Sequence, residues 1–246
     1  MFSKVLPAKL HLANRNPAAK QPSRKKTLRK RPSHGTLCSV SVKVKICGLT
    51  RIEDALAAAA AGADLVGFMF YEPSPRCVSC AQAAAMSEQL PPHIVRVGVF
   101  VNPKAGTVTQ AIAACGLTLL QFHGDETPEF CAQFGLMTMK AFRIRDAASL
   151  AALPRHSAAA WLLDAWSPAG LGGTGERFDW ELAVAARQFG RPIFLAGGLT
   201  PDNVAAAVRQ VQPFGVDVSS GVESAPGVKD AAKLRAFVTA AKTARA

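Results

Sequence analysis

Two residues that could do proton-transfer chemistry each end a short apolar run of this chain. Cys47 ends Val44-Lys45-Ile46-Cys47 before Gly48 and an alanine-rich helical pattern, and Asp164 follows Trp161-Leu162-Leu163. Chemistry in α/β folds gathers at the carboxyl ends of strands. A thiol at a helix N-terminus with a basic neighbour is expected to have a lowered pKa, and a carboxylate ending an apolar strand is costly to bury without a partner or a task. Both are candidate catalytic residues, against the plainer alternatives of a small buried thiol and a helix cap.

Polar groups after two other apolar runs could bind a substrate. The segment Phe70–Arg76 contains two prolines that stiffen it and present Arg76, whose planar guanidinium suits a carboxylate. His123 follows the apolar run Leu119–Phe122 and adds a polar group at the same expected rim; a structural role for it is an equal alternative.

Three glycine-rich segments in the last third of the chain favour an anion site. They are Gly172-Gly173-Thr174-Gly175, Ala196-Gly197-Gly198-Leu199 and Ser219-Ser220-Gly221. Glycine lets backbone N–H groups wrap an anion, although glycine also ends strands for steric reasons. The last two follow the final two predicted strands, where phosphate sites of α/β barrels are frequently found. A phosphorylated substrate is expected.

The elements that position these groups alternate along the chain. Eight apolar runs predict buried parallel strands: Val42–Ile46, Leu65–Met69, Ile94–Val99, Leu119–Phe122, Met137–Phe142, Trp161–Leu163, Pro192–Leu195 and Gly215–Val218. Eight helical patterns begin near Ile52, Ala81, Ala105, Pro128, Ala147, Trp180, Pro201 and Lys229. This count predicts an α/β fold, a single (β/α)8 barrel, with an open doubly wound sheet as the alternative.

Local signals support some of these boundaries. Thr50 precedes Glu53 in capping-box spacing, while Thr127 and Thr200 each precede a proline. In the first strand, alternation places Lys43, Lys45 and Cys47 on one face, with Val44 and Ile46 turned toward the helices. Cys47 is thus expected at the barrel mouth.

The basic charge belongs to one end of the chain. Of 29 basic and 17 acidic residues, the first forty contain ten basic and no acidic ones, which leaves 19 against 17, a net of +2, for the rest. We predict a disordered basic extension over 1–40, either dispensable or an upstream start, with a transit peptide or phosphate contact as alternatives, and one catalytic domain over 41–246.

The six cysteines lack the spacing of a secreted scaffold, and no apolar run approaches the ~18 residues of a membrane span. Cys77-Val78-Ser79-Cys80 lacks two further zinc ligands at suitable spacing, so no metal is expected. A reducing, cytoplasmic setting fits best.

The ordered set of motifs resembles the phosphoribosylanthranilate isomerase family from about Val42 to the C-terminus, and only the basic extension lies outside the pattern. The motifs are Lys45-Ile46-Cys47-Gly48-Leu49-Thr50, Ser74-Pro75-Arg76, Gln121-Phe122-His123-Gly124, Leu163-Asp164, Gly172-Gly173-Thr174-Gly175, Leu195-Ala196-Gly197-Gly198-Leu199 and Ser219-Ser220-Gly221-Val222-Glu223.

This resemblance implies an isomerase of tryptophan biosynthesis that carries out a cofactor-free Amadori rearrangement of N-(5-phosphoribosyl)anthranilate. It implies Asp164 as general acid, Cys47 as general base and Arg76 on the anthranilate carboxylate. The other expected substrate-binding residues, mostly around the phosphate, are His123, Gly173, Thr174, Gly198, Ser219, Ser220 and Gly221. The expected partner is a small phosphorylated molecule, with no nucleic acid or membrane, for a monomer or homodimer.

Three other functions are alternatives to this one. A histidine-pathway aminoaldose isomerase is expected to carry a carboxylate at the position of Cys47, and indole-glycerol-phosphate synthase needs catalytic lysines. The third is an inactive barrel that binds nucleic acid through its basic extension, which the intact set of chemical residues disfavours.

Overall fold

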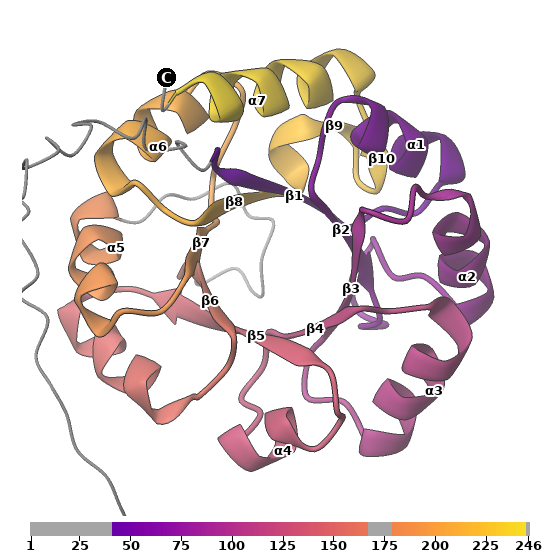
Figure 1. The fold of residues 1–246 in the computed structure, drawn as a ribbon, viewed down its shortest axis with the longest axis horizontal. Helices are drawn as coiled ribbons and strands as arrows, with labels where there is room; N and C mark the ends of the chain where they lie inside the picture. Colours follow the sequence, from indigo (N-terminus) through magenta and orange to yellow (C-terminus); the bar gives the residue numbers. More distant parts are fainter. Residues whose placement is uncertain (1–40, 167–178, 245–246) are drawn as a thin grey trace, which may run out of the picture. The chain divides into compact units, whose positions relative to one another are not determined.

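Eight parallel strands close on themselves in the computed structural model, which describes residues 41–166 and 179–244 (Figure 1). Each strand pairs with the next, and β1 pairs with β8, which completes the barrel. The strands are β1 (Lys43–Cys47), β2 (Leu65–Met69), β3 (Val95–Phe100), β4 (Leu119–Phe122), β5 (Met137–Ile144), β6 (Ala160–Ala165), β7 (Ile193–Leu195) and β8 (Gly215–Val218). The predicted (β/α)8 class is confirmed, while the extension predicted over 1–40 lies outside the described residues.

Helices surround this barrel on its outer side (Figure 1). They are α1 (Ile52–Ala60), α2 (Cys80–Gln89), α3 (Ala105–Cys115), α4 (Pro128–Ala132), α5 (Trp180–Ala186), α6 (Val204–Val211) and α7 (Ala231–Thr243), with the short 3-10 helices η1 (Ala147–Arg155), η2 (Arg187–Phe189) and η3 (Ser220–Val222). The helix predicted after β5 is thus the 3-10 helix η1. It contains Pro154, which lacks the backbone donor that a regular α-helix uses.

Two of the three predicted start signals are wrong. The first residue before α1 is Arg51, and Thr50 instead donates its hydroxyl to the Gly227 carbonyl at 2.6 Å. Helix α6 begins at Val204, not Pro201, because Asn203 accepts the Thr200 N–H and holds the preceding residues in a turn. The third signal is confirmed: the Thr127 hydroxyl accepts the Phe130 N–H at the start of α4.

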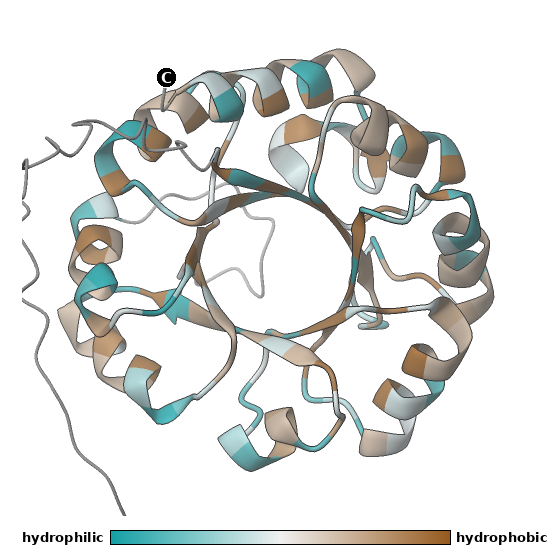
Figure 2. Cartoon of the chain, in the orientation of Figure 1, coloured by the Kyte–Doolittle hydropathy of each residue, from teal (hydrophilic) through white to brown (hydrophobic). Residues whose placement is uncertain are grey.

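Apolar side chains form two separate clusters on the two sides of the barrel wall. The inner cluster includes Cys47, Val97 and Leu162, and the outer one includes Val44 and Ile46. Hydrophobic residues recur along the strands and alternate with polar residues along the helices (Figure 2). The alternation predicted for the first strand is confirmed, and Cys47 faces the inside of the barrel.

A two-stranded antiparallel hairpin that the sequence did not predict stands between η3 and α7. Its strands are β9 (Glu223–Ala225) and β10 (Val228–Lys229), and Glu223 and Lys229 are register partners. Lys229 therefore lies on a strand, and α7 begins two residues later than predicted. Gly227 turns the hairpin with a φ of +79° and receives the Thr50 hydroxyl, so the hairpin rests on the segment that follows β1.

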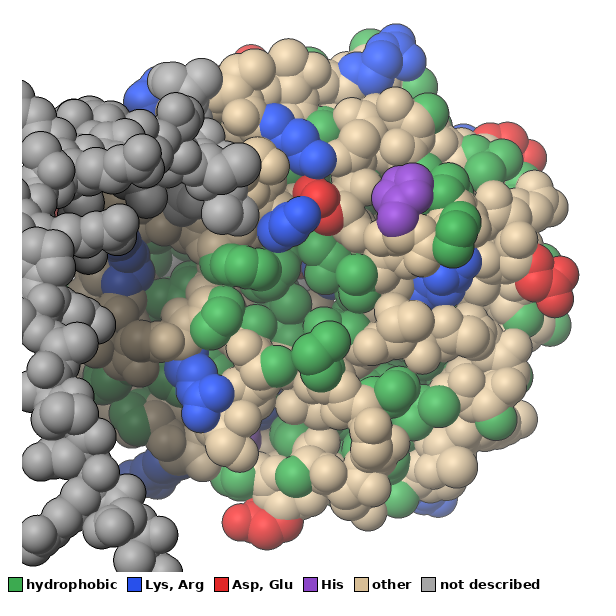
Figure 3. All heavy atoms as spheres, in the orientation of Figure 1, with side chains coloured by type: hydrophobic (Ala, Val, Ile, Leu, Met, Phe, Trp, Pro, Cys, Tyr) green, Lys and Arg blue, Asp and Glu red, His purple; other side chains and the backbone are tan. Residues whose placement is uncertain are grey.

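At the amino-terminal ends of the strands, opposite the carboxyl ends, Met137 and Phe214 are exposed. Hydrophobic side chains gather near the centre of the face shown in Figure 3. Within the described ranges, no helix has the length and apolar character needed to cross a membrane.

Candidate active site

Cys47 is the last residue of β1 and is almost buried in the inner cluster. Its register partner on β2 is Gly67, where a β-carbon would lie 3.0 Å from Cys47 Sγ and 3.2 Å from Lys45 Nζ. The glycine therefore leaves the space in which thiol and ammonium meet. Lys45 is fully buried and pairs with Asp217, its register partner on β8, at 2.8 Å.

The pKa of the Cys47 thiol lies above its ordinary value, which corrects the lowering expected from sequence. Burial raises this pKa most; the Lys45 charge lowers it, Asp217 raises it again, and Lys229 lowers it slightly. A basic neighbour is present as predicted, but burial outweighs its effect, and Asp217 opposes it further.

Asp164 lies near the end of β6 and points to the barrel interior, as Leu162 does two residues before it. Its Oδ1 accepts the backbone N–H of Ala165 at 2.9 Å, and its Oδ2 lies 3.2 Å from His123 Nε2. Gly197 (φ +78°) packs against this turn, since a β-carbon there would lie 2.5 Å from the Ala165 nitrogen. One carboxylate oxygen is therefore fixed, and the other faces an imidazole.

His123 is joined to the barrel wall through Gln121. The Gln121 amide nitrogen lies 3.1 Å from His123 Nδ1, so in the neutral ring the proton sits on Nε2, toward Asp164. Among the described residues Nε2 makes no aligned hydrogen bond despite its 3.2 Å approach to Asp164. The Nε2 proton is therefore close to the Asp164 carboxylate but is not hydrogen-bonded to it.

Arg76 is already paired with a carboxylate of the protein. Its Nε and Nη2 donate to the two oxygens of Glu223 at 2.9 and 2.8 Å, and Lys229 Nζ reaches Glu223 Oε1 at 2.7 Å. The stem of Arg76 crosses Gly48, where a β-carbon would lie 2.5 Å from Arg76 Cδ. The arginine thus passes directly beside Cys47 and keeps Nη1 outside the Glu223 pair.

The loops after β7 and β8 lie against each other, as the predicted phosphate site requires. Gly221 packs so closely on the Leu199 carbonyl that a side chain there would collide with it. Gly198 has a φ of +62°, and its carbonyl accepts the Asn203 amide at 2.8 Å. Ser219 and Ser220 begin the η3 turn, and Ser219 Oγ lies close to Gly48. The structure brings these four predicted residues together, while Gly173 and Thr174 lie outside the described residues.

Several site residues escaped sequence reasoning, namely Asp217, Glu223, Lys229 and Gln121. Each is buried, and buried charged or amide groups are uncommon without partners. Charged residues inside apolar runs, such as Asp217 in Gly215–Val218, were the available signal.

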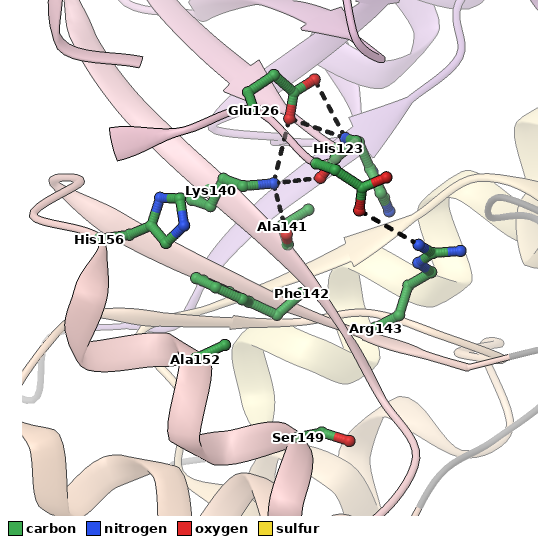
Figure 4. A pocket seen from close by; sticks show the side chains of 11 residues that line it. His123, Glu126, Lys140, Ala141, Phe142, Arg143, Ser149, Ala152 and His156 are labelled. Atoms are coloured by element: carbon green, nitrogen blue, oxygen red, sulfur yellow. Dashed lines mark hydrogen bonds and ion pairs between the residues drawn. The ribbon is translucent and has the colours of Figure 1, made fainter. Parts of the chain in front are cut away.

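A cavity of about 340 Å³ opens beside this site, between β4, β5 and η1 (Figure 4). It shares His123 with the site, but neither Cys47 nor Asp164 lines it. Figure 4 shows the Lys140 ammonium held there by Glu126 and by backbone carbonyls, so this cation is already satisfied. In the described part of the chain no cluster of three or more His, Cys, Asp or Glu side chains could hold a metal ion.

Comparison with known proteins identifies close relatives of the barrel. The family profile described as "PRAI: N-(5'phosphoribosyl)anthranilate (PRA) isomerase" matches residues 44–240. The N-(5'-phosphoribosyl)anthranilate isomerase of Pelobacter propionicus is 53% identical over 204 residues, which cover 83% of this chain and 97% of that protein.

Solved structures agree with the sequence relatives. The phosphoribosyl anthranilate isomerase of Thermotoga maritima superposes with a TM-score of 0.78 at 41% identity, over 82% of this chain and 98% of that chain. Another phosphoribosyl anthranilate isomerase, in complex with reduced 1-(o-carboxyphenylamino)-1-deoxyribulose 5-phosphate, matches with a TM-score of 0.74 at 39% identity, over 82% and 98% of the two chains.

Proposed function

This chain belongs to the N-(5'-phosphoribosyl)anthranilate isomerase family, and from that premise we propose that Asp164 is its general acid and Cys47 its general base. The protein is an isomerase of tryptophan biosynthesis. The reaction converts an aminoaldose into a 1-amino-1-deoxyketose, so one proton must reach the ring oxygen of the sugar and another must leave C2.

The two charged ends of the substrate are held by different loops of the barrel mouth. We place the phosphate at the loops of Gly198 and Ser219–Gly221, together with Gly173 and Thr174 of the segment after β6. The anthranilate carboxylate binds the Nη1 side of Arg76, which lies outside the Glu223 pair. Because Arg76 crosses Gly48, a carboxylate there brings the neighbouring amine and sugar carbons over Cys47.

In the first step Asp164 donates a proton to the furanose oxygen, and the ring opens to a Schiff base. Oδ1 is occupied by the Ala165 N–H, so the proton is delivered from Oδ2. His123 Nε2 lies 3.2 Å from that oxygen and is placed to orient it. A positioned acid of this kind contributes about 10²- to 10⁴-fold to the rate.

In the second step the Cys47 thiolate takes the C2 proton, and the electron pair of the C–H bond forms the enolamine. The cationic Schiff base acidifies C2, so the transfer of its proton becomes favourable only after the ring has opened. The raised pKa of the Cys47 thiol keeps the thiolate fraction small but makes each thiolate a stronger base. Protonation of the enolamine at C1, with loss of the proton of the C2 hydroxyl, then gives the ketone, 1-(2-carboxyphenylamino)-1-deoxyribulose 5-phosphate.

The observation that carries this proposal is the placement of Cys47 and Asp164 at the carboxyl ends of β1 and β6, both turned to the barrel interior. The direct test is an assay of the purified protein with freshly made phosphoribosylanthranilate, followed by its fluorescence decay. We expect turnover without added metal or cofactor, and complementation of a tryptophan auxotroph that lacks this isomerase. Absence of both would reject the assigned reaction.

A further inference from the structure

The β9–β10 hairpin brings two buried, opposite charges to the back of the site. Glu223 and Lys229 are register partners in it, their side chains are 5% and 0% exposed, and their charged atoms meet at 2.7 Å. The hairpin is attached to the segment after β1 through the Thr50–Gly227 hydrogen bond. Its two charges are therefore fixed relative to Cys47.

Contacts run from this hairpin to both the arginine and the thiol residue. Glu223 receives Arg76 through two parallel hydrogen bonds of 2.9 and 2.8 Å. Lys229 Nζ also donates to the Cys47 carbonyl at 2.7 Å and to the Ser219 carbonyl at 3.2 Å. One hairpin thus holds the guanidinium, the end of β1 and the turn after β8 in a single arrangement.

The cluster of Arg76, Glu223 and Lys229 has a net charge of one positive unit. Arg76 and Lys229 carry two cations against the single anion of Glu223, whereas Lys45 and Asp217 balance each other. Burial raises the pKa of Glu223, but Arg76 and Lys229 outweigh burial and hold that pKa below its ordinary value, so the group is an anion near neutral pH. Burial lowers the pKa of Lys229 although Glu223 opposes this, so the positive charge of this cluster is costly until another anion arrives.

The fork geometry decides where that anion binds. A guanidinium offers five N–H donors in a fixed plane and binds carboxylates edge-on. Glu223 occupies the edge made by Nε and Nη2, so the edge that includes Nη1 is the one left for a ligand. Rotation of the guanidinium about its stem would break both bonds to Glu223.

We propose that Glu223, supported by Lys229, is a positioning residue that aims Arg76 at the carboxylate of the substrate's aryl amine, and that the hairpin thereby sets the preference for a carboxylated arylamine. This inference rests on the proposed role of Arg76. Glu223 itself touches no substrate in this arrangement; it acts through the orientation of the guanidinium.

The test is binding of two stable ligands to the full chain by calorimetry. One is reduced 1-(o-carboxyphenylamino)-1-deoxyribulose 5-phosphate, and the other is the same compound made from aniline, which lacks the carboxylate. The variants are Glu223→Asp, which keeps the charge but withdraws the oxygens, Glu223→Gln, which keeps the length but removes the charge, and Arg76→Met. Glu88→Gln, an exposed change of the same charge, is the matched control.

We expect the wild type and the control to bind the carboxylated ligand at least about 30-fold more tightly than the aniline compound, as for a partly buried charge pair. Both Glu223 variants should lose about tenfold of this preference while binding the aniline compound as the wild type does. Glu223→Asp retains the buried anion beside Lys229 and is the variant expected to fold normally, as judged by circular dichroism.

The inference would be overturned if Glu223→Asp kept the wild-type preference for the carboxylated ligand over the aniline compound. An equal loss of affinity for both ligands would also overturn it, because Glu223 would then act only through the general stability of the fold. If Arg76→Met keeps the preference, or the wild type has none, the proposed role of Arg76 is what fails. The two failures are therefore distinguishable.

Discussion

Cys47 and Gly67 face each other across neighbouring strands, with room between them for a sulfur and an ammonium but not for one more carbon. A β-carbon at Gly67 would lie 3.0 Å from Cys47 Sγ and 3.2 Å from Lys45 Nζ. The absence of a side chain at one position on β2 is thus part of how the proposed base is placed.

Gly67→Ala should lower kcat by about 10- to 100-fold, because a general base that is displaced from its position loses most of its contribution to the rate. Gly67 does not adopt a positive φ among the described glycines, so backbone strain adds nothing. Gly106→Ala in α3 meets nothing within 4 Å and should leave kinetics unchanged. Steady-state assays of both variants make the comparison. Equal activity of Gly67→Ala and Gly106→Ala would show that the missing side chain at Gly67 is not needed to place Cys47.

The Lys45–Asp217 pair should set the pH at which the enzyme works. A base must be deprotonated, and burial raises the pKa of Cys47, so kcat/KM should increase with pH through the neutral range and on into the alkaline range. Lys45→Met removes a charge that lowers this pKa, and Asp217→Asn removes one that raises it.

The rising part of the pH profile should therefore move to higher pH in Lys45→Met and to lower pH in Asp217→Asn. The readout is kcat/KM measured across this range. Shifts of the same sign in both variants would show that the pair acts only through folding.

His123 should matter for the acid step and little for binding. His123→Asn keeps an acceptor for Gln121 but removes the nitrogen that faces Asp164, so kcat should fall about tenfold or more with KM little changed. His156→Asn is the matched control, because His156 lines the neighbouring cavity without contacting Asp164. A large increase in KM at unchanged kcat would make His123 a binding residue instead.

Glu223 should contribute to stability in a pH-dependent way. Arg76 and Lys229 hold its folded-state pKa below the ordinary 4.5 despite burial, so its contribution is present above that unfolded value and is lost as pH falls through the folded one. Glu223→Gln should lower the free energy of unfolding by about 3 kcal/mol near neutral pH. The difference in the free energy of unfolding between Glu223→Gln and wild type should disappear at acidic pH. Urea denaturation of both proteins at neutral and at acidic pH measures this difference. A difference that does not change with pH would contradict the account.

Removal of residues 1–38 should leave kinetic constants unchanged. Residues 39–246 form one compact unit, the family profile begins at residue 44, and every proposed site residue lies beyond that point. Charges more than about 10 Å from a site are largely screened at moderate ionic strength. Steady-state kinetics of the truncated and full chains are the comparison. A tenfold loss of kcat/KM on truncation would assign the extension a part in catalysis.

Much of the fold was readable from sequence because parallel strands buried on both faces appear as plain apolar runs. The bounds of β2, β4 and β8 match their predictions. The β9–β10 hairpin was missed because its strands have three and two residues, too short for any periodicity to register. The η1 turn was predicted as a helix because its apolar spacing fits both forms.

The candidate site was predictable where chemistry sits at strand ends, as for Cys47 and Asp164. Its charge pairing was not, because Lys45 and Asp217 are 172 residues apart and only barrel closure makes them neighbours. The pKa of Cys47 was misjudged mainly because burial raises it, and the counter-ion of the lysine was not visible in sequence either.

The most direct measurement is kcat/KM for phosphoribosylanthranilate in Cys47→Ser and Asp164→Asn, each compared with wild type at equal folded concentration. The account predicts that each loses at least about 10²-fold, with affinity for the reduced product analogue largely kept. Turnover close to wild type in either variant, with the fold intact, would contradict the assignment of that residue.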